Sequence, residues 1–348
     1  MPEPLDLDHA RLLVSEALPQ FGIAASAEVE LVKHRENFVF RVDDQAKSFA
    51  IRVHRFGYRT EQEVRTEVAF HRALWSRGVP VSEIVPTVDG SPVCLVTDDA
   101  GRQHAIDLQS WIEDAAPLGT IDEAFDGSSR LTPEVFHMLG SMCAQFHQVT
   151  SRIGRVEGYE RKPWCLEGLV GGDAVWGNPL GLAELTGEDR RVIERVIASL
   201  RLDLSASEHD DRHYGIVHAD FTPENVLVKD GAFHIIDFDD FGEGWYMFDL
   251  ATVLFFYIPH PRYVEYAQSL IAGYRSVRDL PEESLALLAP MLVARGLTYF
   301  GWAAGRPGDE TAEFVTDHLR PFVISMAHGY LARPSSSWAD YLLAPRKP

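Results

Sequence analysis

Residues 216–244 constrain the fold of this chain more than any other stretch. Two short runs rich in β-forming residues, VLVK at 226–229 and FHII at 233–236, flank Asp230-Gly231. An Asp-Gly pair between two such runs predicts a β-hairpin, because the tight turn needs positive φ at both central residues. The hairpin should bring the residue before the first strand close to the residue after the second.

Polar residues stand at both ends of this hairpin. Asn225 comes directly before the first strand and Asp237 directly after the second. A closed hairpin places such ends about 5–6 Å apart. Two oxygen ligands at one edge suit Mg²⁺, which takes a few protein oxygens and leaves its other positions to phosphates and water. We therefore predict that Asn225 and Asp237 are metal ligands.

His218 and Asp220 precede the hairpin in the pattern H-x-D-x-x-x-x-N. In an ATP-dependent phosphotransferase, one Asp takes or orients the proton of the attacking hydroxyl, while an Asn and a second Asp hold Mg²⁺ on the nucleotide phosphates. The spacing predicts that Asp220 is catalytic, that His218 supports the loop, and that ATP and Mg²⁺ are the cofactors. A surface hairpin with polar ends is the alternative, but it does not explain the two upstream residues.

These motifs carry a family resemblance. HADFTPEN at 218–225, IDFDD at 236–240 and FDLA at 248–251 resemble the aminoglycoside phosphotransferase/choline kinase superfamily. Residues 51–55 (IRVHR) and 57–59 (GYR) are most similar to type II homoserine kinase-like and stress-response kinase-like bacterial proteins. The resemblance covers residues 28–330 and implies an α+β, bilobal protein-kinase-like fold, with a small β-rich N-lobe and a larger, mainly helical C-lobe.

The resemblance also predicts how the chain is divided. We expect a nucleotide-binding lobe with a leading helix at 1–109 and a hinge at 110–114. A helical lobe with the catalytic loop and the acceptor site should follow at 115–333, and a tail at 334–348. The length of 348 residues agrees with two lobes rather than one typical domain.

The N-terminal lobe is predicted from its hydrophobic periodicity. The expected elements are a helix at 7–18 and strands at 28–33, 38–42 and 49–53. Asp43-Asp44 is the expected turn between the last two strands. Thr60 and Glu63 form a capping-box pattern that opens a second helix. The positions of that helix expected to face the sheet are Val64, Val68, His71 and Trp75.

Glu67 lies on the same inward stripe, where a carboxylate needs a cation to offset its burial. Arg52, on the third strand, can supply that cation. The resemblance implies that Arg52 contacts the α- and β-phosphates of the nucleotide and that Glu67 holds Arg52 in place. Most relatives have Lys at the position of Arg52. Arg is always charged and bidentate, so phosphate binding should survive. A purely structural salt bridge is the alternative.

Further nucleotide contacts follow from the resemblance. Residues 34–37 replace the glycine-rich loop of protein kinases, with Asn37 near the phosphates, and the backbone of Ser110 and Ile112 should receive adenine. Neither G-x-G-x-x-G nor G-x-x-x-x-G-K-[ST] occurs, so dinucleotide-binding and Walker-type sites have no support.

Beyond residue 130 the chain is predicted to be helical, and residues 118–130 are expected to form a loop. Thr132-Pro133 opens one helix, in which His147 is expected to be a core residue. Residues 186–189 cap a second helix. The remaining expected helices are 261–275, 282–304 and 309–331. Asp249 is predicted to anchor the catalytic loop through internal hydrogen bonds.

The acceptor is the least constrained part of the prediction. Tyr299 and Trp302 are candidates to cage an amine by cation–π attraction, although an aromatic stripe at helical spacing is more often core. Asp239 and Asp240 could assist the metal, contact a cationic substrate or remain solvated. The leading hypothesis is transfer to a hydroxyl of a small amine-bearing molecule. The alternatives are a Ser/Thr protein kinase and a nucleotide-binding pseudokinase.

Composition sets limits on partners. The net charge of −20 disfavours nucleic acid and anionic membranes as partners, and it suits either an amine substrate or simple solubility. Three cysteines without metal or disulfide spacing, and no apparent signal peptide, favour a cytoplasmic protein. A monomer or a homodimer, and ATP or GTP preference, remain open.

Overall fold

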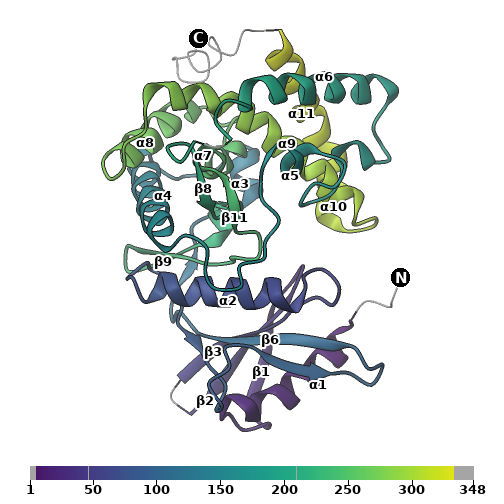
Figure 1. Cartoon of the computed structure of the whole chain (residues 1–348), viewed down its shortest axis with the longest axis vertical. Helices are drawn as coiled ribbons and strands as arrows, with labels where there is room; N and C mark the ends of the chain where they lie inside the picture. Colours follow the sequence, from purple (N-terminus) through teal and green to yellow (C-terminus); the bar gives the residue numbers. More distant parts are fainter. Residues whose placement is uncertain (1–4, 46, 209, 333–348) are drawn as a thin grey trace. The chain divides into compact units, whose positions relative to one another are not determined.

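The computed structural model describes residues 5–45, 47–208 and 210–332, which form two compact units (Figure 1). Unit 1 contains the described residues of Met1–Pro117, with Arg155–Arg161 and Val226–Asp239. Unit 2 contains the described residues of Leu118–Gly154, Lys162–Asn225 and Asp240–Pro348. The 226–239 hairpin thus groups with the β-rich unit, whereas the sequence placed it in the helical lobe. The expected tail, 334–348, lies outside the described residues.

Unit 1 is built on a six-stranded sheet in the order β1-β2-β3-β6-β4, with β5 also paired to β6, and every pair is antiparallel. The strands are β1 Glu28–His34, β2 Phe38–Asp44, β3 Lys47–Val53, β4 Ile84–Val85, β5 Cys94–Thr97 and β6 Gln103–Ser110. The three predicted strands are confirmed. The predicted turn at Asp43-Asp44 is wrong, because both residues belong to β2 and Asp44 pairs with Lys47 across the turn.

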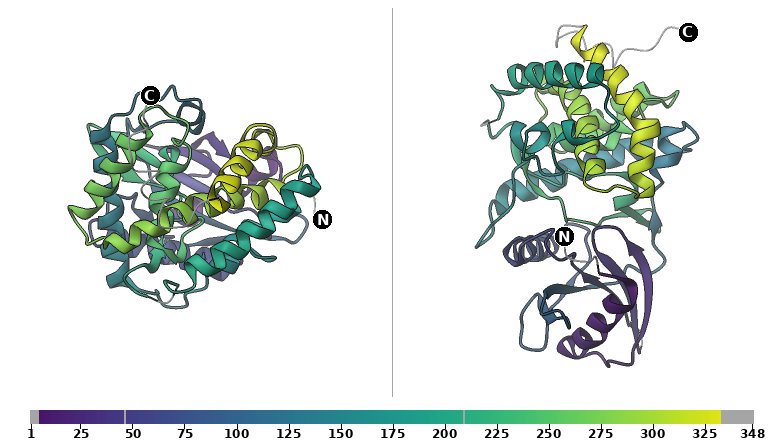
Figure 2. Two further views of the ribbon diagram at one scale, coloured as in Figure 1. Left: turned by 90° about the horizontal axis from the view of Figure 1, so that it is seen from above. Right: turned by 90° about the vertical axis from the view of Figure 1, so that its right-hand side faces the viewer.

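Two helices cover unit 1, α1 (Leu7–Ala17) on one face of the sheet and α2 (Glu61–Trp75) on the other (Figure 2). Leu13 and Val14 of α1 pack with apolar side chains of β2, β3, β5 and β6. Val64 and Val68 of α2 pack with Ile84 and Val93.

The predicted start of α2 is confirmed, whereas the predicted inward orientation of Trp75 is wrong. Thr60 and Glu63 form the reciprocal capping box, and Val64, Val68 and His71 are buried. Trp75 was predicted to face the sheet but is 46% exposed. It is the last residue of α2.

The hairpin predicted from Asp230-Gly231 is present as β9 (Val226–Lys229) and β10 (Ala232–Ile235). Both turn residues have positive φ, 49° for Asp230 and 79° for Gly231, as the primed turn requires. β9 also pairs with β7 (Ala116–Pro117) to give a three-stranded sheet. The local sequence signal was therefore sufficient to define this element.

Unit 2 is mainly helical. Its α-helices are α3 Ile121–Phe125, α4 Pro133–Ile153, α5 Leu166–Val170, α6 Gly187–Leu204, α7 Tyr246–Phe255, α8 Tyr263–Arg275, α9 Leu288–Ala304, α10 Glu310–Phe314 and α11 Arg320–Leu331. Shorter helical turns are η2 Pro179–Gly181, η3 Pro223–Asn225, η4 Glu282–Leu287 and the π-helical η5 Val315–Leu319. Two strands, β8 (Tyr214–Val217) and β11 (Gly242–Trp245), form an antiparallel pair. The helices expected after residue 130 are confirmed, but the expected loop at 118–130 contains α3.

Helices α7 and α9 form the core of unit 2. Every residue of α7 is buried, as are nearly all of α9. The segment Glu282–Ala304 is long and apolar enough to cross a membrane by length and composition. However, 94% of the apolar window within it is buried inside the structure, which identifies it as a core helix.

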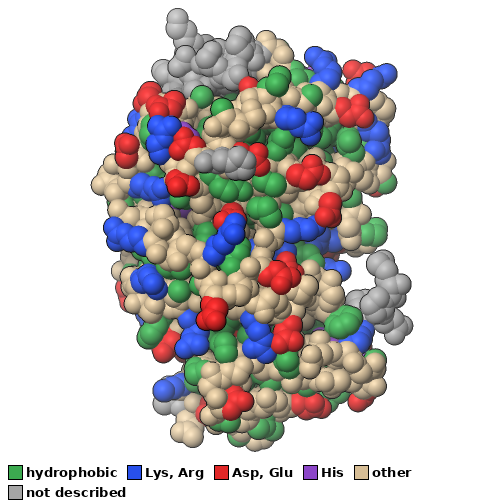
Figure 3. Space-filling view, viewed as in Figure 1, with side chains coloured by type: hydrophobic (Ala, Val, Ile, Leu, Met, Phe, Trp, Pro, Cys, Tyr) green, Lys and Arg blue, Asp and Glu red, His purple; other side chains and the backbone are tan. Residues whose placement is uncertain are grey.

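Acidic and basic side chains are interspersed on the face of the molecule drawn in Figure 3. This face thus carries side chains of both signs, although the whole chain has a net charge of −20.

Candidate active site

The predicted catalytic loop follows β8 in unit 2, and its backbone is held by one buried carboxylate. Asp249 on α7 accepts the N–H of His218 at 2.9 Å and the N–H of Ala219 at 2.8 Å. Ala219 has a φ of 67°, a left-handed conformation that L-residues seldom adopt. Two directed hydrogen bonds help to hold it there. Asp249 is thus the internal anchor that the sequence predicted.

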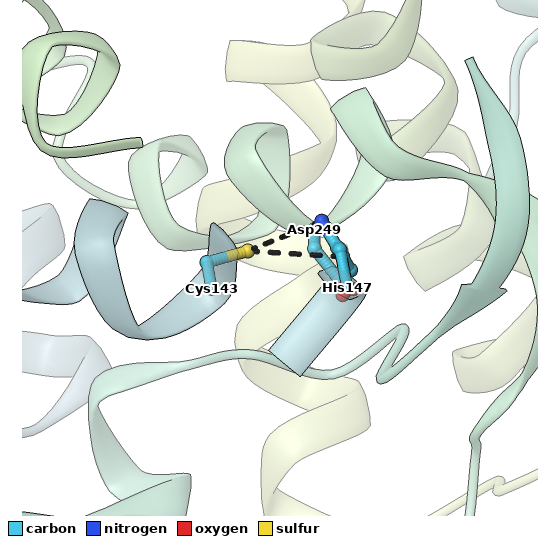
Figure 4. A group of neighbouring side chains, drawn as sticks. All are labelled: Cys143, His147 and Asp249. Atoms are coloured by element: carbon cyan, nitrogen blue, oxygen red, sulfur yellow. Dashed lines mark hydrogen bonds and ion pairs between the residues drawn. The ribbon is translucent and has the colours of Figure 1, made fainter. Parts of the chain in front are cut away.

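A buried cluster of Cys143, His147 and Asp249 lies behind this loop (Figure 4). His147 Nε2 lies 2.9 Å from Asp249, and Nδ1 lies 2.9 Å from the hydroxyl of Tyr274. Burial lowers the pKa of His147, and the neighbouring Asp249 only partly opposes it. Because both ring nitrogens are hydrogen-bonded, the three side chains form a core network rather than a metal site, as predicted for His147.

Asp220 and Asn225 lie together in unit 2. The Asn225 side-chain amide donates to the Asp220 carbonyl at 2.9 Å and to its Oδ2 at 2.8 Å. Both acceptors face the Nδ2 group, so the Oδ1 of Asn225 points the other way. An amide oxygen fixed in this way suits a hard cation such as Mg²⁺.

Arg295 of α9 also contacts Asp220, and the sequence analysis did not predict this contact. Its Nη2 donates to Asp220 Oδ1 at 2.5 Å and to the Tyr299 hydroxyl at 2.7 Å, and its Nη1 donates to the Ala219 carbonyl at 3.0 Å. A signal was present in the sequence, because Arg295 is the one charged residue in the α9 sequence LAPMLVARGLTYFGWAA.

The aromatic side chains proposed as an amine cage are already paired with arginines of the chain. The Arg295 guanidinium carbon lies 4.6 Å from the centre of the Tyr299 ring. The corresponding carbon of Arg306 lies 4.3 Å from the centre of a Trp302 ring. Tyr257, Tyr263 and Tyr266, the neighbouring aromatics, are buried. The structure therefore favours the core interpretation for Tyr299.

In unit 1, Arg52 forms the predicted ion pair with Glu67, with an N–O distance of 2.8 Å. It also forms an ion pair that the sequence analysis missed, with Asp107 at 2.8 Å. Arg52 on β3 and Asp107 on β6 are direct cross-strand partners. Burial would raise the pKa of Asp107, but the Arg52 charge and a hydrogen bond from His54 lower it overall. The cation is thus held between two buried carboxylates.

Asp239 lies in the same buried network. Asn37 donates to its Oδ2 at 2.7 Å, so Asn37 links the β1–β2 loop to Asp239. Burial raises the pKa of Asp239, and the negative charge of Glu67 adds to this effect. Four buried polar atoms have no hydrogen-bond partner among the residues that the structure describes, namely Asp239 Oδ1, His54 Nδ1 and both carboxylate oxygens of Glu67. Glu67 is nevertheless ion-paired to Arg52. His54, Glu67 and Asp239 could together hold a cation or a water molecule.

The remaining predicted residues fall in three places. Asp237, with a φ of 66°, lies in unit 1 with Oδ2 4.0 Å from Lys33 Nζ. Ser110 ends β6, and its N–H donates to the Glu83 carbonyl at 2.8 Å. Because this N–H already forms a hydrogen bond at the edge of the sheet, the backbone of Ile112 is the better candidate to contact the adenine base. Asp240 is in unit 2, where its Oδ1 accepts the indole N–H of Trp176 at 2.9 Å.

Comparison with known proteins shows the family and the fold of the chain. The sequence profile of the phosphotransferase enzyme family (APH) matches residues 28–286. An amicoumacin kinase from Bacillus subtilis (strain 168) is 22% identical over 303 residues, which cover 84% of each chain. An uncharacterised protein from Deinococcus radiodurans is 29% identical over 331 residues, 89% of this chain and 84% of the other.

Solved structures show the same fold. A microcompartment-associated aminopropanol kinase has a TM-score of 0.80 and 27% identity, with 92% of this chain and 97% of the other covered. A choline kinase from Cryptosporidium parvum Iowa II has a TM-score of 0.65 and 12% identity, with 96% and 99% covered. The fold is therefore protein-kinase-like, and the chain is a phosphotransferase with a hydroxyl acceptor that belongs to the phosphotransferase enzyme family.

Proposed function

We propose that this phosphotransferase moves the γ-phosphoryl group of ATP, with Mg²⁺, to the hydroxyl of a small amino alcohol. The observation that carries the proposal is the catalytic loop of unit 2. There Asp220 is 23% exposed in its side chain, while Arg295 and Asn225 donate to its two carboxylate oxygens. A fixed but accessible carboxylate is what the acceptor hydroxyl needs.

The chemical step is a direct displacement at phosphorus. The acceptor oxygen forms a bond to the γ-phosphorus as the bond from that phosphorus to the bridging oxygen of ADP breaks, and ADP leaves with the electron pair. Asp220 orients the hydroxyl and receives its proton, which then passes to solvent. A loose transition state requires accurate positioning more than strong basicity.

The nucleotide-binding role is proposed for residues of unit 1. Arg52 is positioned by Glu67 and Asp107, and its guanidinium would contact the phosphates. Asn225 and Asp237 are the proposed oxygen ligands of Mg²⁺, which would neutralise phosphate charge when bound. The fixed amide orientation of Asn225 supports its part in this assignment.

The amine on the acceptor is proposed from similarity. The aminopropanol kinase aligns over almost the full length of both chains, at 27% identity. The amicoumacin kinase from Bacillus subtilis also acts on a small molecule, as its name states. Because an arginine of the chain already lies over the ring of Tyr299 and another over that of Trp302, we do not assign these two side chains to the amine.

A panel of acceptors tests the proposal. The two positional isomers 1-amino-2-propanol and 3-amino-1-propanol, together with ethanolamine, choline and homoserine, would be incubated with MgATP and followed by phosphorus NMR. Propanol and 2-aminopropane, which each lack one functional group, are the controls. We expect phosphate on an amino alcohol and none on either control. Transfer to casein or to the chain itself, without transfer to any small alcohol, would instead support the protein-kinase alternative.

A further inference from the structure

Arg295 is a fully buried cation in the core of unit 2. Around it lie three aromatic rings, with its guanidinium carbon 4.5 Å from the Trp176 ring centre, 4.6 Å from Tyr299 and 5.7 Å from Phe248. Its ion-pair partner among the described residues is Asp220, at 2.5 Å.

Such a residue is costly for stability alone. Taking a charge out of water costs several kcal/mol in effective terms, and a buried ion pair can often be replaced by apolar side chains without loss. The rest of α9 is apolar, so an aliphatic side chain would suit the position better if packing were its only role. The partner of Arg295 is the proposed catalytic carboxylate.

The arginine also holds the backbone of the loop. Ala219, in its left-handed conformation, is fixed on its N–H side by Asp249 at 2.8 Å and on its carbonyl side by Arg295 at 3.0 Å. Such strained residues persist where the surroundings over-determine them, and they cluster at functional sites. Arg295 therefore fixes both the backbone before Asp220 and the carboxylate itself.

We propose that Arg295 is a positioning residue for phosphoryl transfer, which holds the Asp220 carboxylate in the single orientation that receives the acceptor hydroxyl. This inference rests on the proposed function of Asp220. With Asn225 on Oδ2 and Arg295 on Oδ1, the carboxylate is bound on both oxygens and cannot rotate without losing a hydrogen bond. The trio of aromatic rings keeps the guanidinium itself in place.

The kinetic test compares Arg295→Met, Arg295→Lys and Arg295→Ala with the wild-type chain. With MgATP and an aminopropanol as substrates, we expect kcat to fall about 100-fold in Arg295→Met while the KM for ATP changes little, because misplacing a catalytic group acts on the chemical step. Arg295 donates from two nitrogens, to the Ala219 carbonyl and to Asp220 Oδ1. Lys has a single side-chain nitrogen and cannot reproduce this geometry, so Arg295→Lys should recover little activity. Millimolar guanidinium should partly restore kcat in Arg295→Ala by occupying the vacated space.

Arg278→Met is the matched control. The Arg278 guanidinium carbon lies 4.0 Å from the ring centre of Tyr246, so this variant also removes an arginine stacked on an aromatic ring of unit 2. It should lose stability without a comparable fall in kcat. An equal fall in kcat in both variants, or an unchanged kcat in Arg295→Met, would overturn the positioning role.

Crystal structures of the wild type and of Arg295→Met test the positioning role of Arg295 without a measurement of turnover. In Arg295→Met the Asp220 carboxylate should leave the position it has in the wild type or occupy more than one rotamer, with the rest of unit 2 unchanged. If it stays in place on Asn225, the proposal is wrong. A wild-type chain that phosphorylates no acceptor would refute the proposed function, whereas this comparison would still decide whether Arg295 positions Asp220.

Discussion

Arg52, Glu67, Asp107 and Asp239 of unit 1 form one buried network, in which the forces acting on each carboxylate differ. Asp107 accepts from Arg52, His54 and Gln109. Burial would raise its pKa, but Arg52 and His54 outweigh the burial and lower it. Burial raises the pKa of Asp239, and repulsion by Glu67 adds to this effect, while Asn37 donates a hydrogen bond to its side chain. Their contributions to stability should therefore have opposite signs.

Neutralising each carboxylate tests this contrast. We expect Asp239→Asn to raise the free energy of unfolding by about 1 kcal/mol, because it removes a repelled charge and adds a donor facing Glu67. Asp107→Asn should lower it by about 3 kcal/mol, because Arg52 and His54 lose their best acceptor. Denaturant unfolding at neutral pH, without nucleotide or metal, measures both. Equal effects of the same sign would contradict the assignment.

Acid should weaken the same network. Burial raises the pKa of Glu67 and Asp107, but the Arg52 charge outweighs it, and both folded-state values lie below the ordinary 4.5 and 3.8. A lowered folded pKa gives stability that is complete above the ordinary values and is lost as pH falls through the folded values. Denaturant midpoints should rise slightly as Asp239, whose pKa is raised, takes up a proton, and should then fall below pH 4.5 as Glu67 and Asp107 are protonated. A flat profile into strong acid would contradict the pairing.

The same residues show why part of the site escaped prediction from sequence. Asp220, Asn225 and His218 lie within eight residues of one another, so their spacing is visible in the chain. Asp107 meets Arg52 from 55 residues away and Arg295 meets Asp220 from 75 residues away. Those contacts depend on strand order and helix packing, which local patterns do not specify. A lone charge in an apolar segment was the available signal in both cases.

At the scale of elements, local chemistry predicted most boundaries. The Asp-Gly hairpin, the capping boxes of α2 and α6 and the Pro at the start of α4 are all present. The errors occurred where tertiary packing decides the outcome, as with the short α3 in a predicted loop and the exposed Trp75.

Close packing of α4 against α8 gives a prediction at this scale. A methyl group at Gly140 would overlap the carbonyl oxygen of Leu270, and one at Gly273 would overlap that of His137. Gly140→Ala should therefore lower the free energy of unfolding by about 3 kcal/mol through overpacking. Gly187→Ala, where a methyl meets nothing within 4 Å, should change it by less than about 0.5 kcal/mol. Thermal unfolding separates the pair, and similar losses would refute the packing argument.

At the scale of the whole molecule, the sequence predicted the kinase-like architecture but not the grouping of its segments. The hairpin at Val226–Asp239 belongs to unit 1, while the catalytic loop before it belongs to unit 2. The division into units therefore does not follow the order of segments along the chain, because strands that are far apart in sequence can pair in one sheet. β9 pairs with β7, which lies more than 100 residues earlier in the sequence.

Nucleotide and metal should stabilise the whole chain together. A ligand at 100 times its Kd that binds only the folded state adds about 2.7 kcal/mol to the free energy of unfolding. We expect saturating ATP with Mg²⁺ to give a shift of this size. ATP in excess chelator should give a clearly smaller one, because the metal then no longer shields the phosphates. Equal shifts with and without metal, measured by thermal unfolding, would contradict metal-assisted binding.

The most direct test of the central assignment is the rate of phosphate transfer from MgATP to an aminopropanol in wild type, Asp220→Asn and Asp230→Asn. Asp230 lies in the hairpin turn ten residues further along the chain, where Asn tolerates the same positive φ. We predict that Asp220→Asn loses about 1,000-fold in kcat, because the oriented hydroxyl loses its carboxylate, while Asp230→Asn retains wild-type activity. Transfer at an undiminished rate in Asp220→Asn would contradict the assignment of Asp220 as the catalytic residue.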